Sequence, residues 1–380
     1  MLLSSLPALS TSAPSTWLLT AWISPATFAT LPPARQDAIL RMARTTGLLA
    51  AFEIRLQRAG CLDSLPTRIR AIFEGARMIA LDRSRSIRWE VGRIQRAFYG
   101  TGLPVILLKG AAYHLLNLPL AEGRLTGDVD LLFARIDLPL AESALKEWGW
   151  ITALPDAYDQ RYYREWMHEL PPMFHRERGS EIDLHHAILP DTARLTSDAH
   201  RLLEAVQPVP DHPGIWTLSN EDMVLHSAVH LFHDGAFERM GLRDLTDLDG
   251  LLRHFGSRPA FWESLIERAG LLNLTGPLDH ALWSCARWCA TPIPDAIRQR
   301  VANLARPSLA ARFMRSWLIP LVILPHHPDR RGADPVRAVA AWLLYVRSHW
   351  LRMPLTLLIP HLVHQWTRRW SFNVWHRRAV

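Results

Sequence analysis

The chain has 380 residues, enough for two or three domains or for one core with helical additions, and 49% of them are hydrophobic, as in an ordinary globular protein. Three cysteines form no even framework, which argues against a disulfide-stabilised secreted protein and fits a reducing cytosol. The net charge of +7 is confined to residues 335–380, which contain seven arginines and no acidic residue, so the rest of the chain is formally neutral.

The N-terminal part of the sequence predicts helices and no targeting signal. Residues 1–34 are uncharged and rich in Ser, Thr and Pro, and we expect them to be loose at first. Because Arg35 is the first charged residue, no basic region precedes an apolar start, and a secretory signal is not indicated. From residue 35 to 100 the apolar residues recur every three or four positions, which is the pattern of amphipathic helices.

A short buried strand is predicted at residues 104–110, PVILLKG, because four consecutive aliphatic residues precede Lys109 and Gly110. The next residues, AAYHLLNL, have the composition of a helix. A strand that runs into a glycine and then a helix offers backbone N–H groups to phosphates, and the glycine lets the phosphates approach closely. Lys109 and Arg124 are candidates for the counter-charge. Alternatively, Lys109 is a strand-end lysine that reaches water, and Arg124 pairs locally.

The second predicted strand, DVDLLF (128–133), carries two aspartates. Side chains alternate along a strand, so Asp128 and Asp130 point to the same side. Two carboxylates this close repel each other unless a cation lies between them, and Mg²⁺ prefers such oxygen ligands. The sequence therefore predicts a metal site here. The alternative is an aspartate in a turn, followed by a solvated strand end.

A later hairpin supplies a third carboxylate. Residues 173–188 are predicted to turn at 178–180, and the second arm places Glu181, Asp183 and His185 on one face. We predict that Asp183 is the third ligand, with Glu181 as its competitor; the alternative is a solvent-facing residue of an edge hairpin. Three carboxylates, two metal ions and a nucleoside triphosphate together make a phosphoryl- or nucleotidyl-transfer site.

These segments resemble a known group. LLKGAAYHLL, RLTGDVDLLF, EIDLHH and HLFHDGAFERMGLRDLTDL are similar to the nucleotidyltransferase superfamily, and more narrowly to the bacterial nucleotidyltransferase family proteins, over about residues 95–255. The resemblance implies an α+β fold with a small mixed sheet. It also implies a catalytic role and metal binding, with two Mg²⁺ ions, for Asp128, Asp130 and Asp183, and phosphate contact at Gly110.

The implied activity is transfer of a nucleoside monophosphate from a triphosphate such as ATP to an acceptor, with release of pyrophosphate. A small molecule or a protein is the expected acceptor, rather than nucleic acid. Ala111 follows Gly110 at the expected phosphate-binding position. The superfamily commonly has Ser or Gly there, so a serine hydroxyl contact to phosphate is missing. The alternative is therefore a non-catalytic module that binds a nucleotide, or a partner protein at the membrane surface.

The remaining chain is predicted to be helical. His226, His230 and His233 recur at helical spacing, for which packing is the usual role. We expect a helical region at residues 1–95, a nucleotidyltransferase-like core at 96–200, a helical domain at 201–300 and a basic helical tail at 301–380.

The tail combines arginine with tryptophan. Residues 335–380 contain seven arginines and the tryptophans Trp342, Trp350, Trp366, Trp370 and Trp375. Three interpretations are open: nucleic-acid binding, contact with an anionic membrane surface at the inner face of the membrane, and packing on the protein itself or on another subunit. No apolar stretch reaches the ~18 residues of a spanning helix, so any membrane contact would be peripheral.

Overall fold

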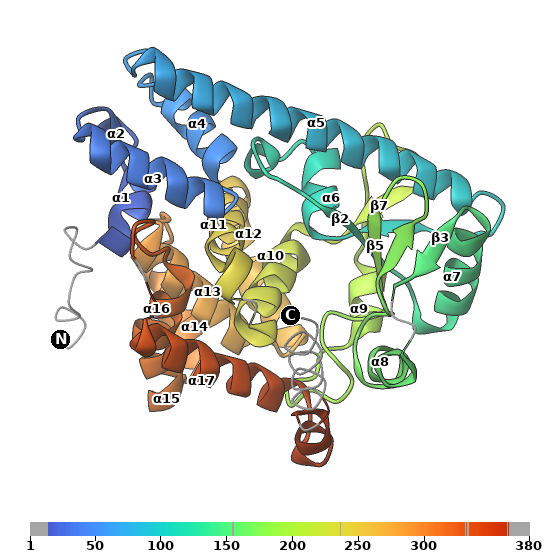
Figure 1. The fold of residues 1–380 in the computed structure, drawn as a ribbon. Helices are drawn as coiled ribbons and strands as arrows, with labels where there is room; N and C mark the ends of the chain where they lie inside the picture. The colour runs from blue at the N-terminus through green and yellow to red at the C-terminus, as the bar shows by residue number, and fades with distance from the viewer. Residues whose placement is uncertain are drawn as a thin grey trace, which may run out of the picture.

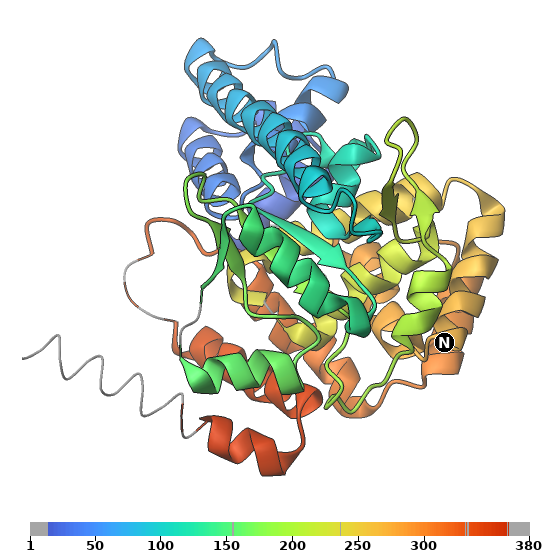
Figure 2. The ribbon, with the colours of Figure 1, turned by 90° about the vertical axis from the view of Figure 1, so that its right-hand side faces the viewer.

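The computed structural model describes residues 14–153, 156–235, 237–330, 332, 334–362 and 364. Within them, helices surround a seven-stranded mixed sheet, which confirms the predicted α+β fold with helical segments before and after the sheet (Figures 1 and 2). A continuous cluster of buried apolar side chains extends from Leu18 to Leu344. The N-terminal helices, the sheet and the C-terminal helices therefore share apolar surface.

The N-terminal region is helical from Trp17. Its helices are α1 (Trp17–Ile23), α2 (Ala26–Ala29), α3 (Pro33–Thr45), α4 (Leu49–Arg58) and α5 (Thr67–Ala97), and α5 crosses the top of the molecule in Figure 1. The expectation that residues 1–34 are loose is wrong where the structure describes them. Leu18 and Trp22 are buried, and Phe28 packs edge-on against Phe52 with 5.2 Å between ring centroids. The prediction relied on the high content of Ser, Thr and Pro and did not consider the apolar residues among them, such as Leu18, Trp22 and Phe28.

The sheet has the strand order β3-β4-β5-β2-β1-β7-β6. Its strands are β1 (Val105–Leu107), β2 (Asp128–Leu132), β3 (Trp150–Thr152), β4 (Met173–His175), β5 (Glu181–His185), β6 (Gln207–Pro208) and β7 (Ile215–Thr217). β2 runs antiparallel to β1 and parallel to β5, while β1 runs parallel to β7. The predicted strands and hairpin are confirmed as β1, β2 and the β4–β5 pair. β3, β6 and β7 were not predicted, because two or three residues carry no periodic pattern.

Four helices follow or connect the strands: α6 (Lys109–Leu115), α7 (Leu138–Glu147), α8 (Ala157–Arg161) and α9 (Ala199–Glu204). α6 begins directly after β1, as the strand–glycine–helix pattern predicts. Lys109 has a φ of 42°, a left-handed conformation that costs a non-glycine residue about 1 to 2 kcal/mol. Such strain commonly occurs at functional sites.

The C-terminal half is a group of helices that lie to the left and lower left of the sheet in the view of Figure 1. Its helices are α10 (Asn220–Val229), α11 (Phe237–Phe255), α12 (Pro259–Leu271), α13 (Thr275–Trp288), α14 (Asp295–Ala305), α15 (Leu309–Phe313), α16 (Ile319–Ile323) and α17 (Pro335–Arg352). Ser219 caps α10, because its hydroxyl accepts a hydrogen bond of 3.2 Å from the Asp222 N–H. Ser219 stands three residues before Asp222, a spacing close to that of a capping box.

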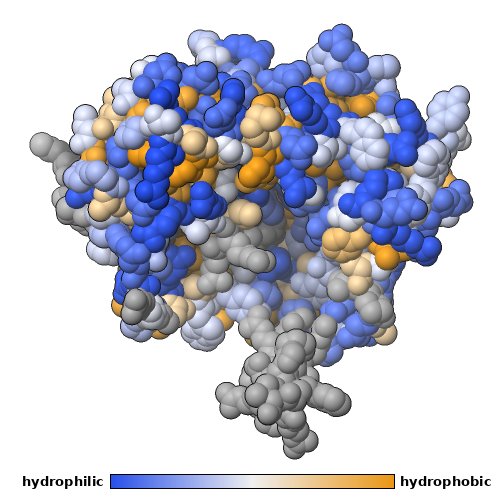
Figure 3. All heavy atoms as spheres, turned by 45° about the horizontal axis from the view of Figure 1, so that its top comes forward, coloured by the Kyte–Doolittle hydropathy of each residue, from blue (hydrophilic) through white to orange (hydrophobic). Residues whose placement is uncertain are grey.

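The molecular surface differs between faces. The face in Figure 3 is mostly hydrophilic, and its apolar patches lie among charged side chains. On α17, by contrast, every exposed position carries an apolar or aromatic side chain, and Trp342 is 61% exposed. In the part of the chain described here, no helix combines the length and hydropathy needed to cross a bilayer. Trp366, Trp370 and Trp375 of the predicted tail lie outside the described residues.

Candidate functional site

Two neighbouring strands bring the predicted carboxylates together. β2 and β5 are parallel and in register, so Asp128 lies beside Glu181 and Asp130 beside Asp183. Adjacent strands are about 4.8 Å apart, and alternate residues share a face. Val129 is buried on the opposite face, which fixes the direction of both aspartates. The in-register pairing explains why an aspartate repeat on one strand and an acidic repeat on the other form a single acidic surface.

Asp130 lies at the centre of a charged network. Its Oδ1 accepts hydrogen bonds from Lys109 Nζ at 3.0 Å and from His185 Nε2 at 2.9 Å, and the residue is only 3% exposed. Burial opposes ionisation of Asp130, but Lys109 and His185 together lower its pKa well below the ordinary value. Burial likewise opposes the charge of Lys109, yet Asp130 and neighbouring carboxylates raise the pKa of its ammonium group. Asp130 is therefore a carboxylate held ionised by hydrogen bonds from the Lys109 ammonium group and the His185 imidazole N–H.

Asp183 has the opposite environment. Its Oδ1 is buried and has no hydrogen-bond partner among the residues that the structure describes. Burial, followed by the charges of Asp130 and Glu169, raises the pKa of Asp183 to about 8. Burial and the charges of Asp128 and Asp130 also raise the pKa of Glu181. Full ionisation of this acidic surface would therefore need positive charge beyond that of Lys109.

Glu169 is a site residue that sequence reasoning missed. The segment before β4 runs antiparallel to the end of β5, so that Glu169 lies opposite His185. Backbone hydrogen bonds from Leu170 to Leu184 and from His186 to the His168 carbonyl hold the segment in place. No periodic pattern marked it, because the pairing is a single bridge between residues that are distant in sequence. Its position adds a fifth carboxylate to Asp128, Asp130, Glu181 and Asp183.

The donor set fits a divalent cation. Asp130, Asp183 and His185 offer ligand atoms that lie within 4.8 Å of one another, and the buried Asp183 Oδ1 lacks a partner that a cation would supply. Two of these three ligand atoms are carboxylate oxygens, which suit Mg²⁺. Asp128 lies at the partly exposed start of β2, on the same side as Asp130. The predicted three aspartates thus share one location, while their role as ligands stays a prediction.

The residues predicted to contact phosphate lie at the start of α6, and most of them are buried. A Cβ atom added to Gly110 would lie 2.7 Å from Thr126 Cγ2 and would also collide with the Arg124 guanidinium. Arg124 is 7% exposed and its Nε donates to Asp247 at 2.9 Å. Ala111 is buried too. Glycine at 110 is therefore required for packing, and the nucleotide contacts of these residues stay predictions.

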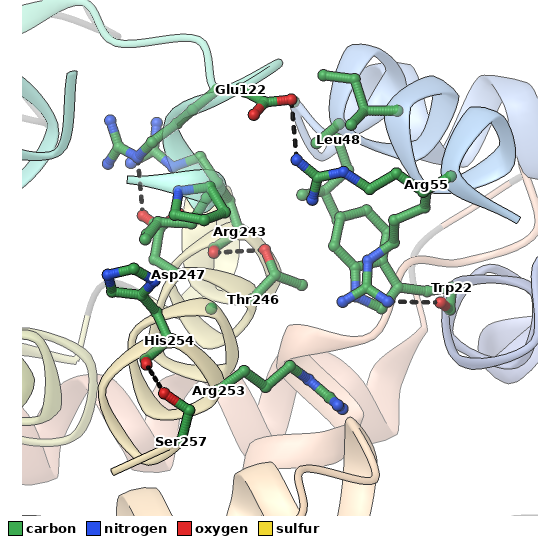
Figure 4. Close-up of a pocket in the computed structure, with 18 residues that line it drawn as sticks. Trp22, Leu48, Arg55, Glu122, Arg243, Thr246, Asp247, Arg253, His254 and Ser257 are labelled. Carbon is green, nitrogen blue, oxygen red and sulfur yellow. Dashed lines mark hydrogen bonds and ion pairs between the residues drawn. The ribbon is translucent and has the colours of Figure 1, made fainter. Parts of the chain in front are cut away.

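A pocket of about 410 Å³ lies beside Arg124, between α4 and α11 (Figure 4). Five arginines line it, and each has an acidic partner nearby. Arg58 pairs with Glu122 at 2.9 Å, and Asp249 pairs with both Arg55 and Arg253. The pairing leaves the lining nearly neutral. The arginines of the pocket are Arg55, Arg58, Arg124, Arg243 and Arg253.

A buried histidine adjoins the acidic surface. His226 of α10 is 4% exposed, and burial together with the charges of Lys109 and His185 lowers its pKa well below the ordinary value. A neutral imidazole is therefore expected there at physiological pH. Packing was the predicted role for this helical histidine series, and the burial of His226 agrees with it.

Comparison with protein families places this geometry in context. A family model described as uncharacterised nucleotidyltransferase matches residues 32–290, which is well over half of the chain. Comparisons with curated proteins and with solved structures gave no match. The matched range includes α3 to α13, the whole sheet and every residue of the acidic surface.

Proposed function

The chain belongs to the uncharacterised nucleotidyltransferase family, and from this premise we propose that it is a metal-dependent enzyme that transfers a nucleoside monophosphate from a triphosphate to an acceptor. One observation carries the proposal: Asp183, on the strand next to Asp130, has a buried carboxylate oxygen that lacks a hydrogen-bond partner in the described part of the chain. A buried carboxylate without a counter-charge is costly, and a bound cation removes that cost.

In the proposed reaction an acceptor hydroxyl oxygen forms a bond to the α-phosphorus, the bond to pyrophosphate breaks, and the proton leaves the acceptor. Mg²⁺, which Asp128, Asp130 and Asp183 would hold, supplies charge neutralisation and activation of the hydroxyl. Asp183 accepts the acceptor proton or holds the ion that activates the hydroxyl, since a carboxylate with a raised pKa is a better base than an ordinary one.

Lys109 has two partners in this proposal. In the structure its ammonium group occupies the same Asp130 oxygen that a divalent cation would use. A cation held by Asp130 would compete with Lys109 for this oxygen, and the Lys109 charge would then be available to the triphosphate. The first-turn N–H groups of Gly110 and Ala111, which an α-helix leaves without internal partners, support phosphate contact, and the buried Arg124 beside Gly110 contributes positive charge.

Calorimetric titration with the four nucleoside triphosphates, with and without Mg²⁺, tests the proposal. We expect saturable binding that requires Mg²⁺ and is lost in Asp128→Asn and Asp130→Asn. Asp37→Asn is the matched control, because Asp37 is an exposed carboxylate on α3, paired with Arg41. Folded wild-type protein that binds no triphosphate would contradict the proposal.

The alternative is a non-catalytic nucleotide-binding module. Two observations favour it: Lys109 and His185 already donate hydrogen bonds to the Asp130 carboxylate, and Ala111 supplies no hydroxyl to a phosphate. The two functions differ in turnover. An enzyme releases pyrophosphate when an acceptor is present, whereas a module binds triphosphate with Mg²⁺ and releases none.

A small-molecule acceptor is supported by the pocket beside Arg124. Its volume of about 410 Å³ lies within the range of ordinary small-molecule sites, roughly 300 to 1,000 Å³. Nucleic acid would require an unpaired basic surface, whereas the arginines of this pocket are paired with carboxylates.

We also propose peripheral membrane contact through α17. Its exposed face is apolar and includes two tryptophans, Trp342 and Trp350, which are residues typical of membrane interfaces. Arg337 and Arg347 donate to the carbonyls of Leu324 and Phe232, so these two arginines of the basic tail support packing rather than lipid contact. The apolar face, rather than these arginines, carries this part of the proposal.

A further inference from the structure

The end of β5 and the segment that pairs with it hold a second group of metal-binding side chains. His168, Glu169 and His185 offer ligand atoms within 4.8 Å of one another. The single antiparallel bridge between Glu169 and His185 fixes two of them, and the rings of His168 and His185 lie 5.5 Å apart between centroids. Two imidazoles and one carboxylate thus converge from two chain segments that backbone hydrogen bonds hold together.

The hydrogen bonds of His185 determine which of its nitrogens is available. Nε2 lies 2.9 Å from Asp130 Oδ1, and an ionised carboxylate can only accept, so Nε2 carries a proton and donates it. The side chain of His185 is 1% exposed, and its Nδ1 has no hydrogen-bond partner among the described residues. Nδ1 lies 3.4 Å from Glu169 Oε2. In a neutral imidazole this places a nitrogen lone pair opposite a carboxylate oxygen, an arrangement that repels unless a cation lies between them.

This arrangement matches the geometry of a histidine metal ligand. A metal-binding histidine commonly donates its second ring N–H to a carboxylate, which fixes the tautomer and orients the ring. Asp130 holds that position for His185. The metal ion would then bind to the buried Nδ1 of His185 and to Glu169 Oε2.

We propose that His168, Glu169 and His185 bind a transition-metal ion, with Asp130 as the outer partner that orients His185. Two nitrogens and one oxygen favour Zn²⁺ over Mg²⁺, which prefers oxygen ligands alone. The site adjoins the proposed Mg²⁺ site, but it does not depend on nucleotidyl transfer. Three protein ligands leave a coordination position open, as in catalytic zinc sites.

A competing explanation is a doubly protonated His185 that bridges Asp130 and Glu169 without a metal. Titration of the untagged, chelator-treated full chain with Co²⁺, a spectroscopic substitute for Zn²⁺, distinguishes the two. We expect one Co²⁺ ion per chain, with visible absorption bands that Zn²⁺ abolishes by displacement and a tenfold excess of Mg²⁺ does not.

Variants locate the ion. His168→Ala and Glu169→Gln should each weaken Co²⁺ binding at least about tenfold, and Asp130→Asn should weaken it by about 10- to 100-fold because the outer partner orients the ligand. Glu165→Gln is the matched control, since Glu165 is an exposed carboxylate four residues before Glu169, paired with Arg161. It should leave the spectrum unchanged.

Asp128→Asn separates this proposal from the proposed function. Asp128 belongs to the predicted Mg²⁺ ligands but not to this group, so the variant should lose Mg²⁺-dependent nucleotide binding and keep the Co²⁺ spectrum. Absence of Co²⁺ bands in the wild-type protein, or bands that survive both His168→Ala and Glu169→Gln, would overturn the proposal.

Discussion

Replacing Asp183 by asparagine should stabilise the metal-free protein, and increasingly so as the pH rises. The folded protein raises the pKa of Asp183 from 3.8 to about 8, chiefly through burial. Between these values the native state keeps the proton and the unfolded chain loses it, so the unfolding free energy of the wild type falls as the pH rises. Asparagine does not titrate and removes this dependence.

The size of the effect follows from the pKa shift. pH 7 lies roughly three units above the ordinary pKa of aspartate, and each unit corresponds to about 1.4 kcal/mol of unfolding free energy. The full effect at pH 7 is therefore about 4 kcal/mol. Because Asp183 is only partly buried, water screens part of this, and we expect Asp183→Asn to be more stable than the wild type by about 2 to 4 kcal/mol at pH 7. Near pH 4 the difference should nearly vanish.

Urea unfolding of both proteins in chelator, from pH 4 to pH 8, measures this dependence. Asp37→Asn, an exposed carboxylate on α3, shows what an ordinary aspartate replacement does. Adding a divalent cation should stabilise the wild type and narrow the gap, because the ion replaces the proton on Asp183. The reasoning would be refuted if the difference in unfolding free energy between Asp183→Asn and the wild type were the same at pH 5 and pH 8. It would also be refuted if Asp183→Asn were less stable than the wild type at pH 8.

Three further perturbations test other parts of the structure. Lys109→Met leaves the buried Asp130 charge with one partner fewer and should lower the unfolding free energy of the metal-free protein by about 3 kcal/mol, with partial recovery in Mg²⁺; denaturant titration with and without the ion checks this. Gly110→Ala should cost about 1 to 3 kcal/mol because of its close contacts, whereas Gly92→Ala, in open space on α5, should be neutral or slightly stabilising by the same denaturant titration. Replacing the α17 tryptophans by serine should weaken binding to vesicles that contain anionic lipid at least about tenfold, a loss of about 1.4 kcal/mol. Trp89→Ser, at an exposed position of α5, should leave vesicle binding unchanged. Equal binding of the wild type and both variants in a sedimentation assay would exclude α17 as the contact.

Local patterns in the sequence were sufficient to predict the strands that carry the site. The aliphatic run before Lys109 and the alternation around Val129 are short-range signals, and both strands formed where they were predicted. The shared face of Asp128 and Asp130 followed from the same alternation.

Features that depend on contacts between distant residues could not be read from the sequence. Glu169 joins the site through one bridge to His185, and Arg124 is buried against Asp247, which lies 123 residues away. β7 has only three residues and is a strand because β1 lies beside it. In each case the partner, rather than the local pattern, determines the structure.

Anomalous scattering from a crystal soaked with Mn²⁺ and a non-hydrolysable nucleoside triphosphate would test the central claim most directly. Mn²⁺ accepts the oxygen ligands of Mg²⁺ and is visible in an anomalous map. We predict at least one peak about 2.2 Å from carboxylate oxygens of Asp128, Asp130 and Asp183, with Lys109 moved from Asp130 to the phosphates. A crystal with ordered nucleotide but no peak beside these aspartates, and with Lys109 still paired to Asp130, would contradict the account.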